Sequence, residues 1–532
     1  MTEDLLLAWR DKTFILGYVF KHYLPALILI VFVSFFLEIK IIKFIGKQYN
    51  PKLISLFKEV GIFIVVSFFV ILGRRGGFNF SGMPLNLIDA YKIQKSPANI
   101  QLILNGIFTQ YYFLKGTNDT KGVINSGYPA EQALKNAKSF LLSENEIFPD
   151  EKYPIMRRLK NSGKRQNYNV VVVLLESWTP KYIDSFNGNK CYNVTPVFDK
   201  IANGGIKFVN AYSAGPRSQF GLIASLVGMQ IVPGTVHYYG FDIMSAFTKI
   251  GAAFRNIGYH TLYAQSYERK SIMMCSVAEN MLGFDRSYGK ENFPQLMNYK
   301  YDNTYDYEMC DFISKKAGES HDQGKSFFIC AFTGTTHIPF IQTAAQFEKY
   351  PPNSEENKYL NNLYYADYSI GHFIEQAKKD GYFDDTIFIF MADHIAGNFA
   401  SAANTKQRFK IPMVIYAPKI FKPQVVEYTV SQADLIPTLY HLMDIAEPFS
   451  AIGVNALDKD ANHFALICDG MNIVFINKKG DYISNNRIMV VESSADKDSS
   501  EYSSLNETLL SLDKSITELI KTNRWYDSGK VA

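Results

Sequence analysis

The chain has 532 residues, more than one hydrophobic core usually supports, so we expect a large domain with additional parts. Hydrophobic residues make up 47% of the sequence and charged residues 20%, as in a globular protein with some membrane-embedded mass. The net charge of +4 is small, and the lysines and arginines are dispersed, so we expect no nucleic-acid partner. The five cysteines form no C-x-x-C pair, which argues against a disulfide scaffold and a zinc knuckle.

Two apolar segments, 14–37 and 53–73, lie near the N-terminus. Each is interrupted by charged or titratable residues near one end, and these can snorkel, which gives both segments the length to span a bilayer. The connecting stretch carries a series of lysines, which by the positive-inside rule places it in the cytoplasm: Lys40, Lys43, Lys47, Lys52 and Lys58. We therefore predict a membrane-embedded hairpin over residues 1–75, with everything after it outside the cytoplasm. A pair of buried or interfacial helices is the alternative.

Residues 76–165 predict helical connectors, including a short amphipathic helix over 131–142. From residue 168 onward, short apolar runs indicate strands buried on both faces, at 170–175, 260–264, 327–332, 386–391 and 412–416. Between the third and fourth runs, apolar residues at helical spacing over 363–377 predict a helix that Gly381 ends.

Strands that alternate with helices predict an α/β fold, with three α/β/α layers around a mostly parallel sheet. We place this catalytic domain at residues 166–450. Residues 451–532 form a predicted C-terminal subdomain packed on it, with two strands over 465–482, a polar stretch over 492–506 and a final helix.

Three of the predicted strands end in polar residues that can bind a metal ion. The first strand is followed by Glu176, and the fourth leads to Asp393 and His394. The third runs into a Thr- and Gly-rich loop that ends at His337. Ligands bind beyond the carboxyl ends of strands in open α/β sheets, so these side chains should converge. Carboxylate and imidazole donors together suit Mn²⁺, Zn²⁺ or Mg²⁺, although a capping Asp393 and a packed His394 are the alternative.

The stretch 213–221 contains the candidate nucleophile, Ser218. A Gly-Pro turn delivers Arg217 and Ser218 to the start of an apolar helical stretch, where the helix N-terminus favours a phosphate or an alkoxide. A metal ion would activate the hydroxyl, and Arg217 would lie beside the phosphoryl oxygens. A simple helix-capping serine is the alternative. His337 can hold a substrate oxygen or protonate a leaving group, or it is a hydrogen-bonded loop histidine.

From about Arg74 to the C-terminus the sequence resembles the lipoteichoic acid synthase-like phosphoglycerol transferases of the alkaline phosphatase/sulfatase superfamily. The stretches that carry the resemblance are Arg75–Gly77, Val171–Ser177, Gly215–Gly221, Gly283–Asp285, Thr336–Phe340, Asp393–His394 and Ser431–Thr438.

The resemblance implies one divalent ion, Mn²⁺ first and Zn²⁺ or Mg²⁺ next, held by Glu176, Ser218, Asp393 and His394. It implies that Ser218 attacks the headgroup of a phosphatidylglycerol-like lipid, forms a covalent phospho-enzyme and passes the group to a glycan or polymer acceptor. In this family the histidine that matches His337 touches the phosphate. The expected location is the bacterial inner membrane, with the catalytic domain on the extracytoplasmic side as part of the cell envelope.

The sequence departs from this family pattern at three points. Ser218 stands where the family usually has threonine, which keeps the hydroxyl. The family's glycerol-phosphate pocket uses a histidine, a tryptophan and an arginine, whereas residues 265–275 contain Arg269, our candidate substrate ligand, but no tryptophan or histidine. The transferred group is therefore predicted only as a phospho-headgroup. Relatives typically carry more membrane helices than the two visible here, which leaves open whether others precede this sequence.

Two other functions remain open. A phosphatase or phosphodiesterase of the same superfamily would use water in place of the acceptor. A non-catalytic membrane protein would keep the fold for binding. A sulfatase is disfavoured, because Cys or Ser followed by x-Pro-x-Arg is required and Pro216 lies three residues after Ser213 instead of two.

Overall fold

The computed structural model describes residues 60–65, 67–68, 128–160, 167–188, 192–231, 233, 246–270, 274–294, 306–397 and 405–527. The chain divides into two compact units, one of Met1–Leu85 with Lys300–Asp302 and one of the remaining residues. In the first unit the described residues are helical, and apolar side chains such as Phe63 are exposed. The rest of the predicted hairpin over 1–75 lies outside the described residues. Among the helices that are described, none has the length and apolarity to cross a membrane.

A nine-stranded sheet forms the centre of the second unit. Its strands lie in the order β10 (Gln424–Val426), β4 (Ile206–Tyr212), β9 (Lys410–Tyr416), β8 (Thr386–Ala392), β3 (Asn169–Leu175), β7 (Phe327–Phe332), β5 (His260–Gln265) and β6 (Arg286–Tyr288), with β11 (Val430–Ser431) also paired to β4. Every residue of β3, β7 and β8 is buried, as their continuous apolar runs predict.

The sheet is mixed rather than parallel throughout. β3 runs parallel to β7 and β8, and β5 runs parallel to β6 and β7. β9 is antiparallel to both β8 and β4. An apolar run indicates a buried strand but carries no information on its direction, which the connection decides. β4 was not predicted from the sequence, because Lys207 and Asn210 interrupt its apolar residues and the strand is only half buried.

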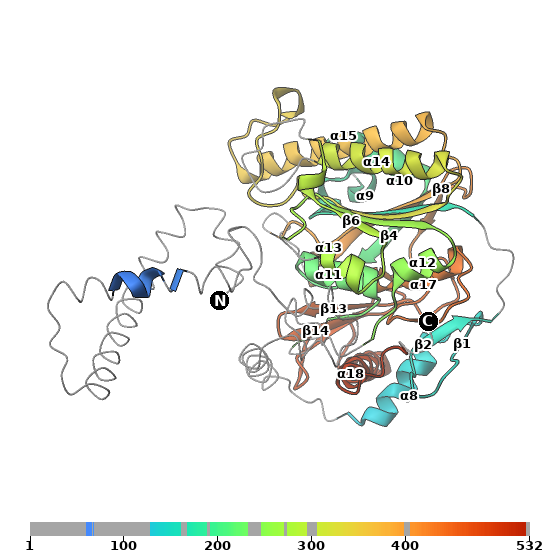
Figure 1. Ribbon diagram of the computed structural model, residues 1–532. Helices are drawn as coiled ribbons and strands as arrows, with labels where there is room; N and C mark the ends of the chain where they lie inside the picture. The colour runs from blue at the N-terminus through green and yellow to red at the C-terminus, as the bar shows by residue number, and fades with distance from the viewer. Residues whose placement is uncertain are drawn as a thin grey trace, which may run out of the picture. The chain divides into compact units, whose positions relative to one another are not determined.

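Helices cover both faces of this sheet, which confirms the three α/β/α layers (Figure 1). One face carries α9 (Asp184–Asn187), α10 (Pro196–Gly204), α14 (Asp306–Asp322) and α15 (Glu355–Lys379), and the other carries α11 (Ser218–Val227), α12 (Ile250–Asn256), α13 (Met274–Asn280) and α17 (Leu435–Leu442). The predicted helix over 363–377 is the C-terminal part of α15, and Gly381 follows it with φ +82°.

A second, four-stranded antiparallel sheet lies beyond α11 and α17 (Figure 1). It consists of β13 (Ala465–Asp469), β14 (Asn472–Ile476), β15 (Tyr482–Asn485) and β16 (Val490–Ser493). The sequence predicted two strands here, because β15 and β16 are short and polar. The final helix, α18 (Ser500–Lys521), begins inside the predicted polar stretch, where the Ser499 side chain caps it by accepting from the Tyr502 N–H.

Residues 128–160, which belong to the second unit, pack on this C-terminal part. α8 (Ala130–Leu141), predicted as an amphipathic helix, lies against α18. The helical connector also contains two short strands, β1 (Glu146–Ile147) and β2 (Met156–Leu159), and β2 pairs with β12 (Phe449–Ser450). Arg157 of β2 is fully buried and donates to Glu146 and to the carbonyls of Ala451 and Gly453. This network fixes the segment to the chain around Ala451 and Gly453.

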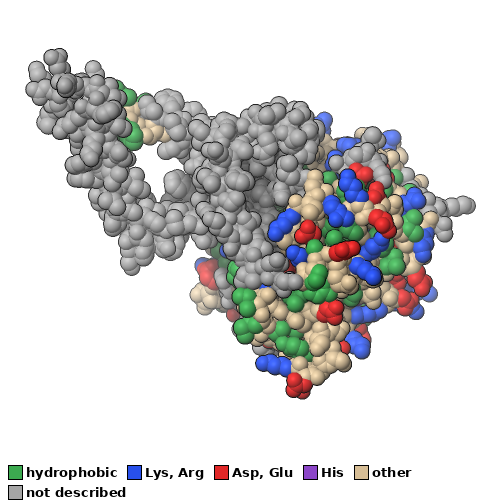
Figure 2. All heavy atoms as spheres, turned by 90° about the horizontal axis from the view of Figure 1, so that it is seen from below, with side chains coloured by type: hydrophobic (Ala, Val, Ile, Leu, Met, Phe, Trp, Pro, Cys, Tyr) green, Lys and Arg blue, Asp and Glu red, His purple; other side chains and the backbone are tan. Residues whose placement is uncertain are grey.

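Basic and acidic side chains are interspersed over the described part of the face that Figure 2 shows. On that part of the surface no extended area of one sign stands out, in keeping with the net charge of +4.

Candidate metal and phosphoryl site

Two adjacent strands bring the acidic side chains together. β3 and β8 are parallel and in register, with Leu175 opposite Ala392, so Glu176 and Asp393 leave the sheet side by side. The Asp393 N–H still donates to the Leu175 carbonyl at 3.1 Å, which extends the ladder to the site. The expected convergence at the carboxyl ends of the strands is therefore present.

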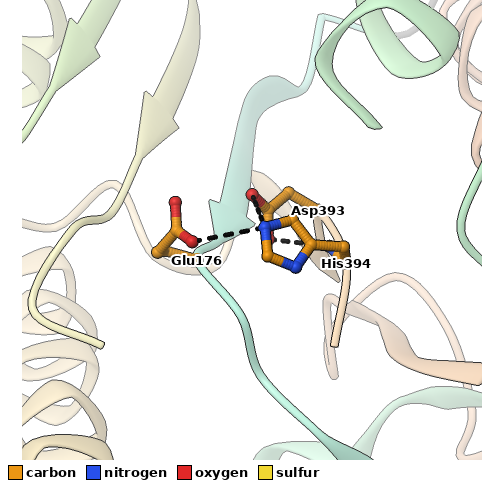
Figure 3. Close-up of side chains that lie close together, drawn as sticks. All are labelled: Glu176, Asp393 and His394. Carbon is orange, nitrogen blue, oxygen red and sulfur yellow. Dashed lines mark hydrogen bonds and ion pairs between the residues drawn. The ribbon is translucent and has the colours of Figure 1, made fainter. Parts of the chain in front are cut away.

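Glu176, Asp393 and His394 each offer a ligand atom, and these atoms lie within 4.8 Å of one another. His394 Nε2 is 3.5 Å from Glu176 Oε1 and 3.5 Å from Asp393 Oδ2, as the dashed lines in Figure 3 indicate. Both carboxylates are 0% exposed. Two buried carboxylates whose oxygens lie within 4.8 Å of each other require positive charge between them.

The hydrogen bonds around the cluster leave one ligand atom of His394 and one of Asp393 available. His394 Nδ1 lies 2.8 Å from the Ile395 carbonyl, and a proton there leaves the Nε2 lone pair for a metal ion. Asp393 Oδ1 accepts the N–H groups of Ser177 and His394, whereas no hydrogen-bond donor among the described residues reaches the buried Oδ2. This open carboxylate oxygen fits a divalent cation.

The pKa values of the cluster express the same need for positive charge. Burial and the neighbouring Glu176 charge raise the pKa of Asp393 to about 7. Burial opposes the charge of His394, but Asp393 and Glu176 raise its pKa to about 10. Burial likewise opposes the charge of Glu176, and His394 and His337 outweigh it, so the pKa of Glu176 falls to about 2. A divalent cation supplies the charge that protons otherwise provide.

Ser218 is the first residue of α11, and its hydroxyl points into the cluster. Its Oγ is 3.3 Å from Glu176 Oε2 and 3.2 Å from His394 Nε2. A helix N-terminus also presents unpaired N–H groups that favour an anion. The structure thus unites the predicted nucleophile with the predicted metal ligands.

Gln432 holds the loop before Ser218 against the end of β8. Its amide nitrogen donates to the carbonyls of Ala392 and Asp393, both at 2.8 Å, and its oxygen accepts from the Ala214 N–H at 2.7 Å. Gln432 is fully buried. Gln432 lies in Ser431–Thr438, one of the stretches that carry the family resemblance, but the sequence indicated no role for it. Its partners are backbone groups from other segments of the chain.

His337 and Tyr267 also lie close to Glu176. The Tyr267 hydroxyl donates to Glu176 Oε2 at 3.2 Å, and its ring meets the His337 ring edge-to-face at 5.8 Å. Thr333 accepts from the Glu176 N–H and Thr336 donates to its carbonyl, so the Thr-rich loop after β7 fixes the Glu176 backbone. The sequence placed His337 near the site but gave no signal for Tyr267.

The two predicted arginine ligands differ in their surroundings. Arg217 is exposed and directly precedes Ser218 at the start of α11, and its role at the phosphoryl group stays a prediction. The Arg269 guanidinium instead pairs with Glu279 at 3.1 Å, and the Arg269 backbone N–H donates to Glu291. Among the described residues, these contacts of Arg269 do not include the metal-ligand cluster, and its substrate-binding role stays a prediction.

Comparisons with known proteins identify the family. Residues 168–445 match the family model described as Sulfatase. Lipoteichoic acid synthase-like YvgJ of Bacillus subtilis is 22% identical over 335 residues, which cover 58% of this chain and 52% of that protein. Phosphoglycerol transferase I of Salmonella arizonae is 25% identical over 246 residues, covering 43% of this chain and 31% of the relative. The chain thus spans about half of the first relative and about a third of the second.

Solved structures share the fold. A protein of the alkaline phosphatase superfamily from Vibrio parahaemolyticus matches with a TM-score of 0.65 and 21% identity, covering 75% of this chain and 98% of its own. The lipoteichoic acid synthase LtaP from Listeria monocytogenes matches with a TM-score of 0.56 and 14% identity, covering 74% and 98%. The family match spans more than half of the sequence and contains every residue of the cluster, and this chain therefore belongs to the sulfatase family.

Proposed function

We propose that this chain is a membrane-anchored, metal-dependent transferase. It moves a phospho-headgroup, phosphoglycerol or similar, from a phosphatidylglycerol-like lipid to a glycan or polymer acceptor outside the cytoplasm of a bacterial cell. The observation that carries the proposal is the position of Ser218 Oγ, 3.3 Å from Glu176 Oε2 and 3.2 Å from His394 Nε2. Similarity to YvgJ and to phosphoglycerol transferase I supports the choice of headgroup.

Four residues would hold the metal ion: Glu176, Ser218, Asp393 and His394. Their oxygen and imidazole donors suit Mn²⁺, with Zn²⁺ and Mg²⁺ as the other candidates. A bound divalent cation lowers the pKa of the Ser218 hydroxyl and neutralises phosphoryl charge.

Ser218, Glu176, His337 and Arg217 each have a separate role in the first half-reaction. Ser218 Oγ forms the bond to phosphorus while the bond from phosphorus to the diacylglycerol oxygen breaks. The Ser218 proton leaves along its hydrogen bond to Glu176 Oε2. His337 protonates the departing oxygen, and Arg217 with the α11 N-terminus holds the phosphoryl oxygens.

The second half-reaction returns the enzyme to its starting state. An acceptor hydroxyl attacks phospho-Ser218 and gives its proton to His337, the Oγ–phosphorus bond breaks, and Oγ regains its proton from Glu176. Water at the same position would give a phosphodiesterase, so the acceptor decides between the two functions.

Anchoring in the membrane is supported by the described residues of the first unit. Ile62, Phe63 and Ile64 are consecutive on a helix and are 59%, 52% and 60% exposed. A helix that is apolar all round needs an apolar environment. A bilayer supplies it and would bring the catalytic domain to its lipid substrate.

The proposal is tested with the full chain in nanodiscs of phosphatidylglycerol, supplied with Mn²⁺. We expect diacylglycerol release together with a mass increase on Ser218. Ser218→Ala should reduce release by about a thousandfold or more, whereas Ser218→Thr keeps the hydroxyl and should retain activity. Ser225→Ala, which removes the buried hydroxyl of a second serine in α11, is the matched control and should behave like wild type.

Two results would change the proposal. Diacylglycerol release that persists in Ser218→Ala would remove Ser218 from the chemistry. Release with glycerol phosphate as the sole product, even when a glycan acceptor is supplied, would favour the phosphodiesterase.

A further inference from the structure

The chain turns sharply at Ser177, one residue after Glu176. The φ angle of Ser177 is +58°, in the left-handed region that side chains with a Cβ rarely adopt. Glycine is the usual residue at such a turn. Ser177 is also only 7% exposed, so solvent does not account for a polar residue here. A strained backbone at the edge of a candidate site points to a functional requirement for this side chain.

Ser177 contacts both carboxylates of the cluster, with two different groups. Its hydroxyl donates to Glu176 Oε1 at 2.7 Å. Its backbone N–H donates to Asp393 Oδ1 at 2.8 Å. The left-handed conformation allows one residue to reach two acids that come from different strands.

These two bonds select which carboxylate oxygens remain available. With Oε1 engaged by Ser177, Glu176 presents Oε2 to the Ser218 hydroxyl at 3.3 Å and to the Tyr267 hydroxyl at 3.2 Å. With Oδ1 taken, Asp393 presents Oδ2, which lies 3.5 Å from His394 Nε2 and accepts no hydrogen bond from the described residues. Asp393 Oδ2 is thus open to a cation, and Glu176 Oε2 is the oxygen that faces Ser218.

The carbonyl of Ser177 is fixed as well. It accepts from the Tyr359 hydroxyl at 2.8 Å and from the Thr179 hydroxyl at 3.3 Å. Thr179 in turn accepts from the Ala396 N–H, which lies two residues after the ligand His394. Every polar group of Ser177 is therefore engaged, and its unusual conformation is imposed by several elements at once.

We infer that Ser177 is a positioning residue that orients Glu176 and Asp393 for a divalent cation. The inference rests on the proposed metal site and adds a residue outside the ligand set. If Ser177 were only a turn residue, its hydroxyl would be dispensable and glycine would serve equally well. Outer hydrogen-bond partners of metal ligands typically change metal affinity by about 10- to 100-fold.

Two substitutions separate the hydroxyl from the turn. Ser177→Gly removes the bond to Glu176 but keeps the N–H and relieves the left-handed strain. Ser177→Ala removes the same bond and keeps the strain. Asp444→Gly is the matched control, because Asp444 also has a positive φ, +50°, and lies outside the site.

The experiment measures Mn²⁺ binding by calorimetry to the metal-stripped full chain, together with thermal unfolding without metal. We expect Ser177→Gly and Ser177→Ala to bind Mn²⁺ about 10-fold or more weakly than wild type. The glycine variant should unfold at a higher temperature than the alanine variant. Asp444→Gly should bind Mn²⁺ like wild type.

The outcomes distinguish this inference from the proposed function. Wild-type protein that binds neither Mn²⁺ nor Zn²⁺ would overturn the metal site itself. If Ser177→Gly binds Mn²⁺ as tightly as wild type does, only the positioning role is overturned. Should Ser177→Gly fail to fold, Ser177→Ala supplies the same comparison.

Discussion

Gly221 of α11 lies directly against the backbone of Asp393, so that a Cβ on Gly221 would be 2.3 Å from the Asp393 carbonyl oxygen. Gly221 is three residues after Ser218 and therefore shares its face of the helix. This close approach is what allows the Ser218 hydroxyl to reach Glu176 and His394. The position of the nucleophile thus depends on a residue with no chemistry of its own.

We predict that Gly221→Ala separates the nucleophile from the cluster. The added methyl group meets backbone, which cannot rotate away, so α11 must shift. A displacement of about 1 Å at a reactive group costs about 100-fold in rate, and kcat for diacylglycerol release should fall accordingly. Gly318→Ala is the control, since its nearest atom would be 3.5 Å away and alanine stabilises a helix by up to about 1 kcal/mol relative to glycine. Unchanged kcat in Gly221→Ala would contradict the role of this contact.

Replacing Gln432 by leucine should destabilise the protein and abolish activity. The change leaves the carbonyls of Ala392 and Asp393 and the N–H of Ala214 without this partner, and each buried group left unsatisfied costs about 1–3 kcal/mol. Urea unfolding should show a loss of about 3 kcal/mol or more. Thr429→Val serves for comparison, because the buried Thr429 hydroxyl makes no hydrogen bond to the described residues and its loss should be nearly neutral. Equal stability of the two variants would exclude Gln432 as a bridge.

The two arginines should respond differently to substitution. Arg217→Ala should raise KM for the lipid donor by about 10-fold, since a charge-assisted hydrogen bond to phosphate contributes about 1.5–3 kcal/mol. Arg269→Ala should leave KM nearly unchanged, because Glu279 already pairs with the Arg269 guanidinium. Steady-state kinetics over a range of lipid concentrations will measure KM for both variants. A large rise of KM in Arg269→Ala would instead support the substrate contact that the family resemblance implies.

Cation affinity should increase as the pH rises. Without metal, burial and Glu176 raise the pKa of Asp393 to about 7, and the acidic neighbours raise that of His394 to about 10 despite burial. Both groups must lose a proton before they can bind a cation, so protons compete with Mn²⁺ below these values. Calorimetry at pH 6, 7 and 8 should show tighter binding at each step, with proton release that depends on the buffer. Affinity that is independent of pH in this range would show that neither group is a ligand.

Much of the fold was predictable because buried strands carry a strong local signal. β3, β7 and β8 consist of apolar residues throughout, and their ends placed Glu176, Asp393 and His394 on one edge. β4, β15 and β16 were not predicted, since half-buried or short strands mix polar and apolar residues and resemble loops. The antiparallel direction of β9 was also inaccessible, because it depends on a connection and not on the strand itself.

The sequence by itself determined the chemical identity of the site: two acids and a histidine at strand ends, and a serine at a helix start. Those signals are local, since each depends on a few neighbouring residues. Only the tertiary structure decided how the groups meet, through Gly221 at the Asp393 carbonyl, Gln432 between distant backbones and Ser177 between the two carboxylates. Contacts of this kind join segments that lie 39 to 218 residues apart in the sequence, by close approach and by hydrogen bonding to backbone, and such interactions leave no periodicity or spacing in the sequence.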